Sequence, residues 1–428
     1  MASAPGDVGP IRPRGRSVAP RVTPLRTRVP RVVWMAVALG VAARLVFALG
    51  YWVDKPLTHD EREYLRLARN VAEGRGFAHL QPDGTPVPGE HFGRAPAYPV
   101  FLAGLVRAAG APPEADVALL RTIRAVQAVL GGVLVWLVAW LAGNAAGPKA
   151  AAAAGWLAAV YPPLVWTPAF IWSETLFSVL ALGCAIVLSL ERRAPGTYVA
   201  AGAIAGLAVL TRPAMLFFLP LAALWLAWRR EWRAVLLFTL ACMLVIAPWT
   251  VRNAREYGRF VLIASEGGIT FWTGNHPLAV GEGDLAANPQ LKRENVALRA
   301  RYPGRTPEEL EPIYYREAMT FIREQPAAWA GLMARKVFYS VVPVGPSYRL
   351  HSALYVGASV FPYVAVLPFA LMGLARLARA GRLPTPLLLL AASSFLVGLV
   401  FFPQERFRIP VVDPTLLVTA ASWLALRA

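Results

Sequence analysis

The chain has 428 residues, of which 57% are hydrophobic and only 16% are charged. Soluble domains carry about 25% charged residues, so this composition excludes a string of soluble domains, and its hydrophobicity excludes a disordered chain. The formal charge is +18, but the basic residues gather at the ends of long apolar runs rather than on one soluble face, which excludes a nucleic-acid-binding domain and indicates a polytopic membrane protein.

Segment 1–31 is rich in Arg, Pro, Gly and Ser and lacks the apolar region and cleavage site of a signal peptide. We expect a basic, disordered cytoplasmic tail that fixes orientation and contacts anionic lipid. The remainder, 32–428, is predicted to form one transmembrane domain.

Ten apolar runs have about the 20 residues that a membrane-spanning helix needs. They are 33–52, 121–143, 149–167, 173–190, 197–211, 213–228, 234–250, 353–375, 384–402 and 410–426. The fold class predicted from them is an all-α polytopic membrane protein of about ten transmembrane helices. Both cysteines, Cys184 and Cys242, fall inside these runs, so no disulfide framework is expected.

Two shorter runs, 96–110 and 327–343, are placed by charge. Basic clusters mark the cytoplasmic side of the membrane. The tail and Lys149 can both lie on that side only if a single one of the two runs 96–110 and 121–143 crosses the membrane. The run 121–143 is longer and more uniformly apolar, so 96–110 is expected to lie at the outer surface of the membrane. The pair Arg335–Lys336 would interrupt a span, so 327–343 is also expected to be interfacial.

This topology puts both termini inside and leaves two outward loops, 53–120 (the first loop) and 251–352 (the second loop). All five histidines fall in these loops. The exclusion of His from apolar helices explains that placement better than a shared metal site does.

The first loop contains the start signal of a helix. Thr58 can cap it, Asp60 and Glu61 favour its positive end, and Gly74 can stop it. An apolar stripe at helical spacing predicts a helix on the membrane surface; it consists of Tyr64, Leu67, Ala68 and Val71. A carboxylate at its tip could act as a general base or bind a divalent cation, while dipole stabilisation alone is the alternative explanation.

Arg94 precedes a helix opened by Pro96 and could bind a phosphate in bidentate fashion, although an interfacial Arg reaching lipid headgroups is an alternative. Other charges lie within or beside spans, where each costs about 2.5–3.5 kcal/mol without a partner. They are Arg44, Glu174, Arg212, Arg406 and Arg408. All but Arg44, which is expected to lie deeper, are predicted at the outer boundary, and this favours a cavity there for an anionic ligand with an apolar tail. A structural network with pairs of the Arg44–Glu174 type is the competing interpretation.

The second loop combines aromatic residues with Asn275 and His276 beside Gly274. These residue types bind sugars, and they are equally typical of an interfacial aromatic belt. Amphipathic helices are predicted over 308–323 and 328–342.

Taken together, these motifs resemble those of bacterial membrane glycosyltransferases of the GT-C fold, of the type related to protein O-mannosyltransferases and to the lipid A aminoarabinose transferase. The resemblance runs from about residue 33 to 426. The matching segments are Asp60-Glu61 with Tyr64, Arg94-Ala95-Pro96, Ser173-Glu174, Leu210-Thr211-Arg212-Pro213, Pro248-Trp249 with Arg252-Asn253, and Arg406-Phe407-Arg408-Ile409-Pro410.

The resemblance implies an inverting transferase that moves a hexosyl or pentosyl group from a polyprenyl-phosphate donor to a lipid, glycan or protein acceptor. The expected location is the bacterial cytoplasmic membrane, with the active site facing the periplasm or the exterior. A transporter or flippase of polyprenyl-linked sugars and a glycan polymerase or ligase are the alternatives.

The resemblance implies that Asp60 and Glu174 are acids of the catalytic site and that Arg94, Arg212 and Arg406 hold the donor phosphate. Beside these, Glu61 is predicted as a further catalytic acid, and Tyr64, Asn275 and His276 are predicted as contacts of the sugar or the acceptor. Asp60 is also the candidate ligand of a divalent metal ion. At Gly93, relatives of the aminoarabinose-transferase type carry an acid, so one metal ligand is missing here.

Overall fold

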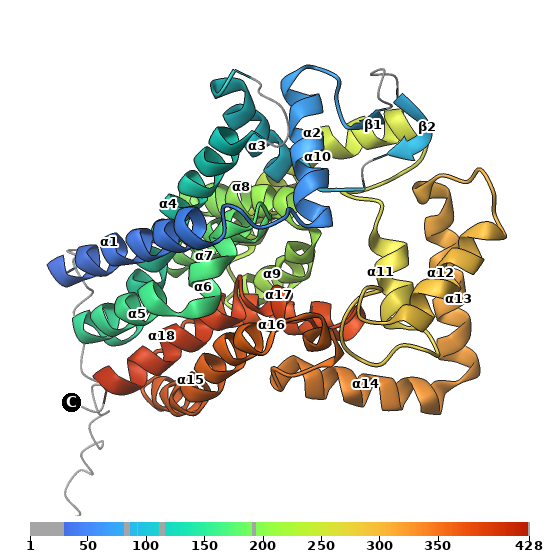
Figure 1. The fold of residues 1–428 in the computed structure, drawn as a ribbon. Helices are drawn as coiled ribbons and strands as arrows, with labels where there is room; N and C mark the ends of the chain where they lie inside the picture. Colours follow the sequence, from blue (N-terminus) through green and yellow to red (C-terminus); the bar gives the residue numbers. More distant parts are fainter. Residues whose placement is uncertain (1–29, 81–85, 92, 111–115, 191–193, 427–428) are drawn as a thin grey trace, which may run out of the picture.

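A computed structural model describes residues 30–80, 86–91, 93–110, 116–190 and 194–426 (Figure 1). Nearly all of the predicted tail, 1–31, lies outside these residues. The regular secondary structure of the described chain is helical except for one antiparallel hairpin, formed by β1 (Ala78–Leu80) and β2 (Pro86–His91). The predicted all-α membrane fold is therefore confirmed, with the hairpin as an unexpected addition.

The helices have the following bounds. In the first half of the chain they are α1 (Arg31–Leu45), η1 (Val46–Tyr51), α2 (His59–Ala72), α3 (Ala97–Ala108), α4 (Val117–Ala146), α5 (Pro148–Val160), α6 (Pro162–Trp166), η2 (Thr167–Ala169), α7 (Glu174–Ser189), α8 (Pro195–Thr211), η3 (Pro213–Phe217) and α9 (Phe218–Trp228). In the second half they are α10 (Trp232–Tyr257), α11 (Gly267–Gly274), α12 (Pro289–Ala300), α13 (Pro307–Glu324), α14 (Pro326–Val341), η4 (Pro346–Leu350), α15 (Ala353–Arg379), α16 (Thr385–Val400), α17 (Glu405–Arg408) and α18 (Val412–Ala425).

All ten predicted spans are helical, but their lengths differ. Within the described ranges, four helices are long and apolar enough to cross a membrane by themselves; they are α1 with η1, α4, α10 and α15, of 21, 30, 26 and 27 residues. The predicted span 149–167 breaks at Tyr161 into α5 and α6, because Pro162 and Pro163 follow it. The two runs placed at the interface form α3, which at 12 residues is too short to span, and α14.

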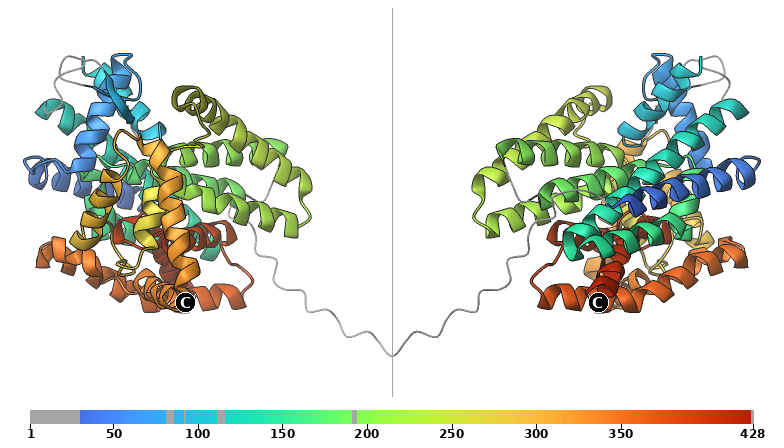
Figure 2. Two further views of the ribbon diagram at one scale, coloured as in Figure 1. Left: turned by 90° about the vertical axis from the view of Figure 1, so that its right-hand side faces the viewer. Right: turned by 90° about the vertical axis from the view of Figure 1, so that its left-hand side faces the viewer.

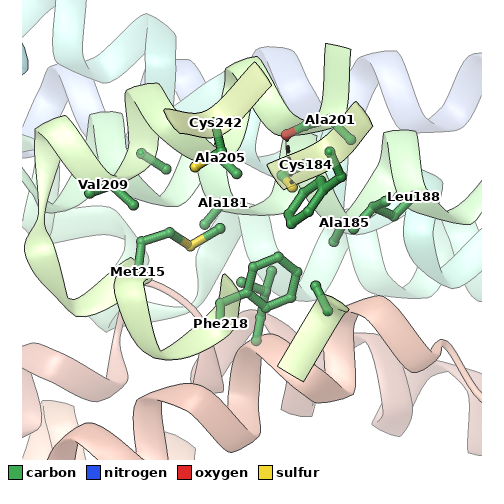
Figure 3. Close-up of a cluster of buried hydrophobic side chains, with 14 of the residues drawn as sticks. Ala181, Cys184, Ala185, Leu188, Ala201, Ala205, Val209, Met215, Phe218 and Cys242 are labelled. Carbon is green, nitrogen blue, oxygen red and sulfur yellow. Dashed lines mark hydrogen bonds between the residues drawn. The ribbon is translucent and has the colours of Figure 1, made fainter. Parts of the chain in front are cut away.

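Small residues let the helices approach closely in the bundle. A Cβ atom at Gly202 of α8 would collide with the carbonyl oxygen of Phe238 in α10, and Gly206 one turn later faces the same helix. Such small-residue contacts are the usual way in which membrane helices pack. Figure 3 shows the core beside this contact, where the free cysteines Cys184 and Cys242 lie among alanines and Phe218.

Helix α2 begins and ends as predicted. Thr58 is its N-cap, Ala72 is its last residue, and Gly74 has a φ of +79°. Its apolar stripe, however, does not lie on a membrane surface. Tyr64 and Ala68 pack in one buried cluster with Leu102 of α3 and Ile123 of α4, so protein covers this face and holds the N-terminus of α2 against the bundle.

The second loop folds into its own small cluster of helices. α11, α12 and α13 share an apolar core that includes Trp272, Leu298 and Tyr314. These helices lie at the right of Figure 1, and Figure 2 shows α8 to α10 in light green projecting to one side of them. The predicted helices over 308–323 and 328–342 correspond to α13 and α14, and Thr306 caps α13 with a capping box.

Candidate active site

The two acids at the N-terminus of α2, Asp60 and Glu61, contact different partners. Glu61 completes a capping box: its Oε2 accepts the Thr58 amide at 2.8 Å. Its Oε1 accepts the Ile171 amide at 3.0 Å and lies 3.9 Å from the Arg124 guanidinium. Glu61 is fully buried, so this side chain ties α2 to the segment before α7. These contacts connect helices of the bundle, and the catalytic role expected for Glu61 stays a prediction.

Asp60 lies at the same helix start but faces an arginine pair. Arg94 donates from Nη2 to Oδ1 at 2.8 Å, and Arg406 donates from Nη1 to Oδ2 at 2.5 Å. Burial raises the pKa of this carboxyl, but the two guanidinium groups outweigh burial and lower the pKa to about 2. Asp60 is therefore ionised at neutral pH, with both oxygens occupied.

Arg94 is surrounded by carboxylates instead of lipid headgroups. Its Nε and Nη2 donate to Glu63 at 2.9 and 2.5 Å, and Glu266 from the second loop lies 3.7 Å away. The guanidinium also lies over the ring of Tyr64, 5.2 Å from its centroid. Tyr64 thus forms one wall of the site and donates its hydroxyl to Ser173 at 3.4 Å.

Glu174 is the second acid of the site and is 1% exposed. Its Oε1 accepts Arg212 Nη1 at 2.6 Å and also Arg406 Nε. Its Oε2 is buried and has no hydrogen-bond partner among the residues that the structure describes. Trp172 supports this arrangement, because the Arg406 guanidinium stacks 4.2 Å from its ring centroid.

These contacts form a continuous chain of alternating charge, which we call the ion-pair chain. It runs through Glu63, Arg94, Asp60, Arg406, Glu174 and Arg212. Its three cations come from the start of α3, the start of η3 and α17. The formal charges cancel, so this site combines three guanidinium groups with three carboxylates in a largely buried setting.

A cavity of about 190 Å³ adjoins the ion-pair chain at Glu63 and Gly93. The second loop supplies its other walls, namely Ser265, Glu266, Ile269, Arg299, Pro307, Leu310, Glu311 and Tyr314. A Cβ atom at Gly93 would lie 2.7 Å from Cγ of Glu266, so Glu266 fills the space beside the missing side chain. Burial raises the pKa of Glu266, which Arg94 lowers and Glu63 raises further.

Other residues singled out in the sequence lie apart from this chain of contacts. The Asn275 amide donates to the carbonyls of Phe271 and Val400 and accepts from Lys336. His276 accepts the Leu278 amide through Nδ1 at 3.1 Å. These contacts hold the second loop together, and both residues remain unconnected to Asp60 by any contact among the described residues.

Arg44 does not pair with Glu174. It donates to the carbonyls of Gly40, Ala158 and Ala159 at 2.8–3.2 Å, so it closes the end of α5. A Cβ atom at Gly131 would collide with the Arg44 side chain, which shows how closely α4 fits around it. The predicted example of an Arg44–Glu174 pair is therefore wrong, and Arg44 has a structural position.

The acids at Asp60 do not form a metal site. Within the described part of the chain, no group of three or more His, Cys, Asp or Glu residues is placed to hold a metal ion. Both Asp60 oxygens already accept from guanidinium groups. The residues present therefore do not fit a divalent cation at this position.

Two acids of the site, Glu63 and Glu266, were missed in the sequence. Glu63 follows Asp60 by three positions and so shares a face of α2, a signal that helical spacing provides. Glu266 carries no such signal, because only the path of the second loop brings it to Arg94.

No protein-family model and no curated protein sequence matches the chain. Solved structures do. The Archaeoglobus fulgidus oligosaccharyltransferase AglB, in complex with an inhibitory peptide and a dolichol-phosphate, matches with a TM-score of 0.58 and 18% identity over 92% of this chain and 50% of that chain. The A. fulgidus oligosaccharyltransferase with Zn and sulfate gives a TM-score of 0.57 and 16% identity, over 92% and 49%.

ArnT from Cupriavidus metallidurans, bound to undecaprenyl phosphate, matches at 13% identity over 92% of this chain and 78% of that chain, with a TM-score of 0.41. The chain spans about half the length of the oligosaccharyltransferase structures. At these identities the likeness establishes the fold, which is the GT-C fold of membrane glycosyltransferases.

Proposed function

We propose that the protein is a membrane glycosyltransferase that moves a sugar from a polyprenyl-phosphate donor to a lipid, glycan or protein acceptor. The observation that carries this proposal is the ion-pair chain, in which Arg94, Arg406 and Arg212 flank the carboxylates of Asp60 and Glu174. The GT-C fold and the dolichol-phosphate in the AglB complex support a lipid-phosphate donor.

The arginines match the charge change of such a reaction. The donor is a phosphodiester with one negative charge. When the bond between the sugar C1 and the phosphate oxygen breaks, the electron pair leaves with polyprenyl phosphate, which then carries two charges. Arg212 and Arg406, fixed by Glu174, are placed to stabilise the added charge in a site that excludes most water.

Asp60 is the proposed base. The acceptor hydroxyl or amine gives its proton to Asp60 while its oxygen or nitrogen forms the new bond to C1 from the opposite face, which inverts the configuration. In the paired state the pKa of Asp60 is about 2, because Arg406 and Arg94 hold its charge. Donor phosphate competes for these guanidinium groups, so donor binding raises the basicity of Asp60.

The acceptor side is the cavity beside Gly93. It opens next to Asp60's partner Arg94 and is bounded by the second loop, so an acceptor there would approach the sugar away from the lipid tail. Glu174 Oε2 is buried and finds no partner in the described part of the chain, so it is the proposed acceptor of a hydrogen bond from a sugar hydroxyl. The proposed location is the bacterial cytoplasmic membrane, with this side outward and the N-terminus in the cytoplasm.

Purified protein in lipid vesicles tests the proposal. A panel of radiolabelled polyprenyl-phosphate sugars is supplied with a membrane extract as the source of acceptor, and released polyprenyl phosphate is measured. Asp60→Asn is compared with Asp284→Asn, a second-loop position where Asn can still accept the Ala286 amide. We expect wild type and Asp284→Asn to transfer sugar and Asp60→Asn to lose at least about 100-fold. Movement of intact donor lipid across the vesicle without sugar release, equal in all three, would instead identify a flippase.

A further inference from the structure

The Arg406 guanidinium lies where two acids of the site meet. It donates to Asp60 through Nη1 and to Glu174 through Nε, so it bridges a carboxylate of the first loop and a buried carboxylate at the start of α7. A buried carboxylate such as Glu174 and a partly exposed one such as Asp60, gathered at one site, are stabilised by a cation between them, and a divalent metal ion is one common solution. Here a side chain supplies the cation.

We propose that Arg406 acts as a built-in counter-cation in place of a divalent metal ion, so that transfer proceeds without metal. This inference rests on the proposed glycosyl transfer. Arginine is suited to the task because its guanidinium stays charged at every physiological pH and offers several donors in one plane. One plane can therefore serve both acids and still present a further N–H to a phosphate oxygen.

The position of Arg406 is fixed from several sides. Its guanidinium stacks on Trp172 at 4.2 Å. The residues around it on α17 are tied to other helices, since Glu405 accepts from Tyr355 of α15 at 3.0 Å and Arg408 lies 2.8 Å from Asp413 of α18. This four-residue helix is thus held at both ends, which limits the positions that the Arg406 guanidinium can take.

The neighbouring residues oppose a metal at the same place. Oδ1 of Asp60, the oxygen that Arg406 leaves free, accepts from Arg94 at 2.8 Å. Glu63, a further acid within reach, is engaged by the same guanidinium. At Gly93, where a ligand would have to be added, the space is taken by Glu266. A metal ion would have to displace two arginines and bind beside their charge.

Equilibrium binding of Mn²⁺, followed by electron paramagnetic resonance, tests the inference independently of activity. Metal-stripped wild type is expected to bind no Mn²⁺ at this site and to transfer sugar equally with and without a chelator. Arg406→Met removes the cation while keeping a long side chain. It should lose at least about 100-fold in transfer, expose Asp60 and Glu174 as a new Mn²⁺ site, and regain part of its activity with added guanidinium ion.

Arg301→Met is the matched control, because Arg301 is 60% exposed and pairs only loosely with Glu317 at 3.9 Å. It should behave as wild type in both measurements. The inference is overturned if wild type binds Mn²⁺ in a manner lost in Asp60→Asn, or if a chelator abolishes wild-type transfer and Mn²⁺ restores it. Absence of transfer with every donor would refute the proposed function, while Mn²⁺ binding to the wild type would still decide the role of Arg406.

Discussion

Arg406 and Asp60 are 346 positions apart in the sequence, and the guanidinium of one donates to the carboxylate of the other at 2.5 Å. One residue belongs to α17 near the C-terminus and the other to α2 near the N-terminus. The candidate active site therefore exists only when both ends of the bundle are in place. A fragment of the chain that omits either α2 or α17 lacks it.

Arg212 offers a test of the phosphate-binding assignment. Its Nη1 lies 2.6 Å from Glu174, and its guanidinium lies 5.5 Å from the ring centroid of Phe407. We expect Arg212→Ala to raise the KM for the donor by at least about 10-fold, which corresponds to one charge-assisted hydrogen bond. Arg212→Lys should recover part of the loss. Arg229→Ala, which removes an exposed pair with Glu231, should leave the KM unchanged. Equal donor KM values in all variants would make Arg212 a structural residue.

Glu405 predicts a pH dependence of stability. Burial raises its pKa to about 7, although Arg408 and the hydroxyl of Tyr355 lower it. An acid with a raised folded pKa contributes stability that is complete below its ordinary pKa and is lost as pH rises through the folded value. The loss should fall between about pH 4.5 and 7 and amount to about 3 kcal/mol at most. Thermal unfolding in detergent should show this decline in wild type and a flatter curve in Glu405→Gln. If the stabilities of wild type and Glu405→Gln changed with pH in parallel, this prediction would be contradicted.

The buried Lys336 should make stability rise with pH, which is the opposite trend, at higher pH. It is fully buried, donates to Asn275 and to the Leu399 carbonyl, and burial lowers its pKa to about 7. The unfolded chain binds this proton up to about pH 10.5, so stability should rise with pH between about 7 and 10.5. The full effect is about 5 kcal/mol at most. Relative to Lys336→Met, wild type should therefore gain stability from pH 7 to 9.5. A difference between their unfolding temperatures that stays constant over this pH range would contradict the prediction.

Gly202 predicts the sensitivity of the α8–α10 contact. A Cβ atom there would collide with the Phe238 carbonyl oxygen, which is backbone and cannot turn aside. We expect Gly202→Ala to destabilise the protein by about 1–3 kcal/mol through overpacking. Gly183→Ala is the control, because nothing lies within 4 Å of a Cβ at that helical position. Thermal unfolding of the two variants compares them, and equal stability would mean that the two helices can separate at little cost.

The sequence predicted the helices well, since apolar runs and caps depend on neighbouring residues. The cap at Thr58 and the stop at Gly74 are local signals of this kind. The partner of the apolar face of α2 was not predicted, because an apolar stripe can pack equally well against lipid or against protein side chains such as Leu102 of α3. The break at Tyr161 was also missed, although the two prolines after it were visible.

The candidate site was predicted in part. Its arginines and two of its acids stood out because charges beside apolar runs need partners. Their pairing could not be read from the sequence, since it depends on which helices become neighbours. Glu61 was grouped with Asp60 by proximity, yet one position along a helix turns a side chain by about 100°, and the two acids face different partners.

The close fit of Gly93 against Glu266 also bears on how this site can vary in evolution. A Cβ at residue 93 would lie 2.7 Å from the Glu266 side chain, so the two positions share one volume. A side chain can enter at residue 93 only if the Glu266 side chain turns away or becomes smaller. Homologues that carry an acid at residue 93 should therefore either have a smaller residue at 266 or direct its side chain away from Arg94.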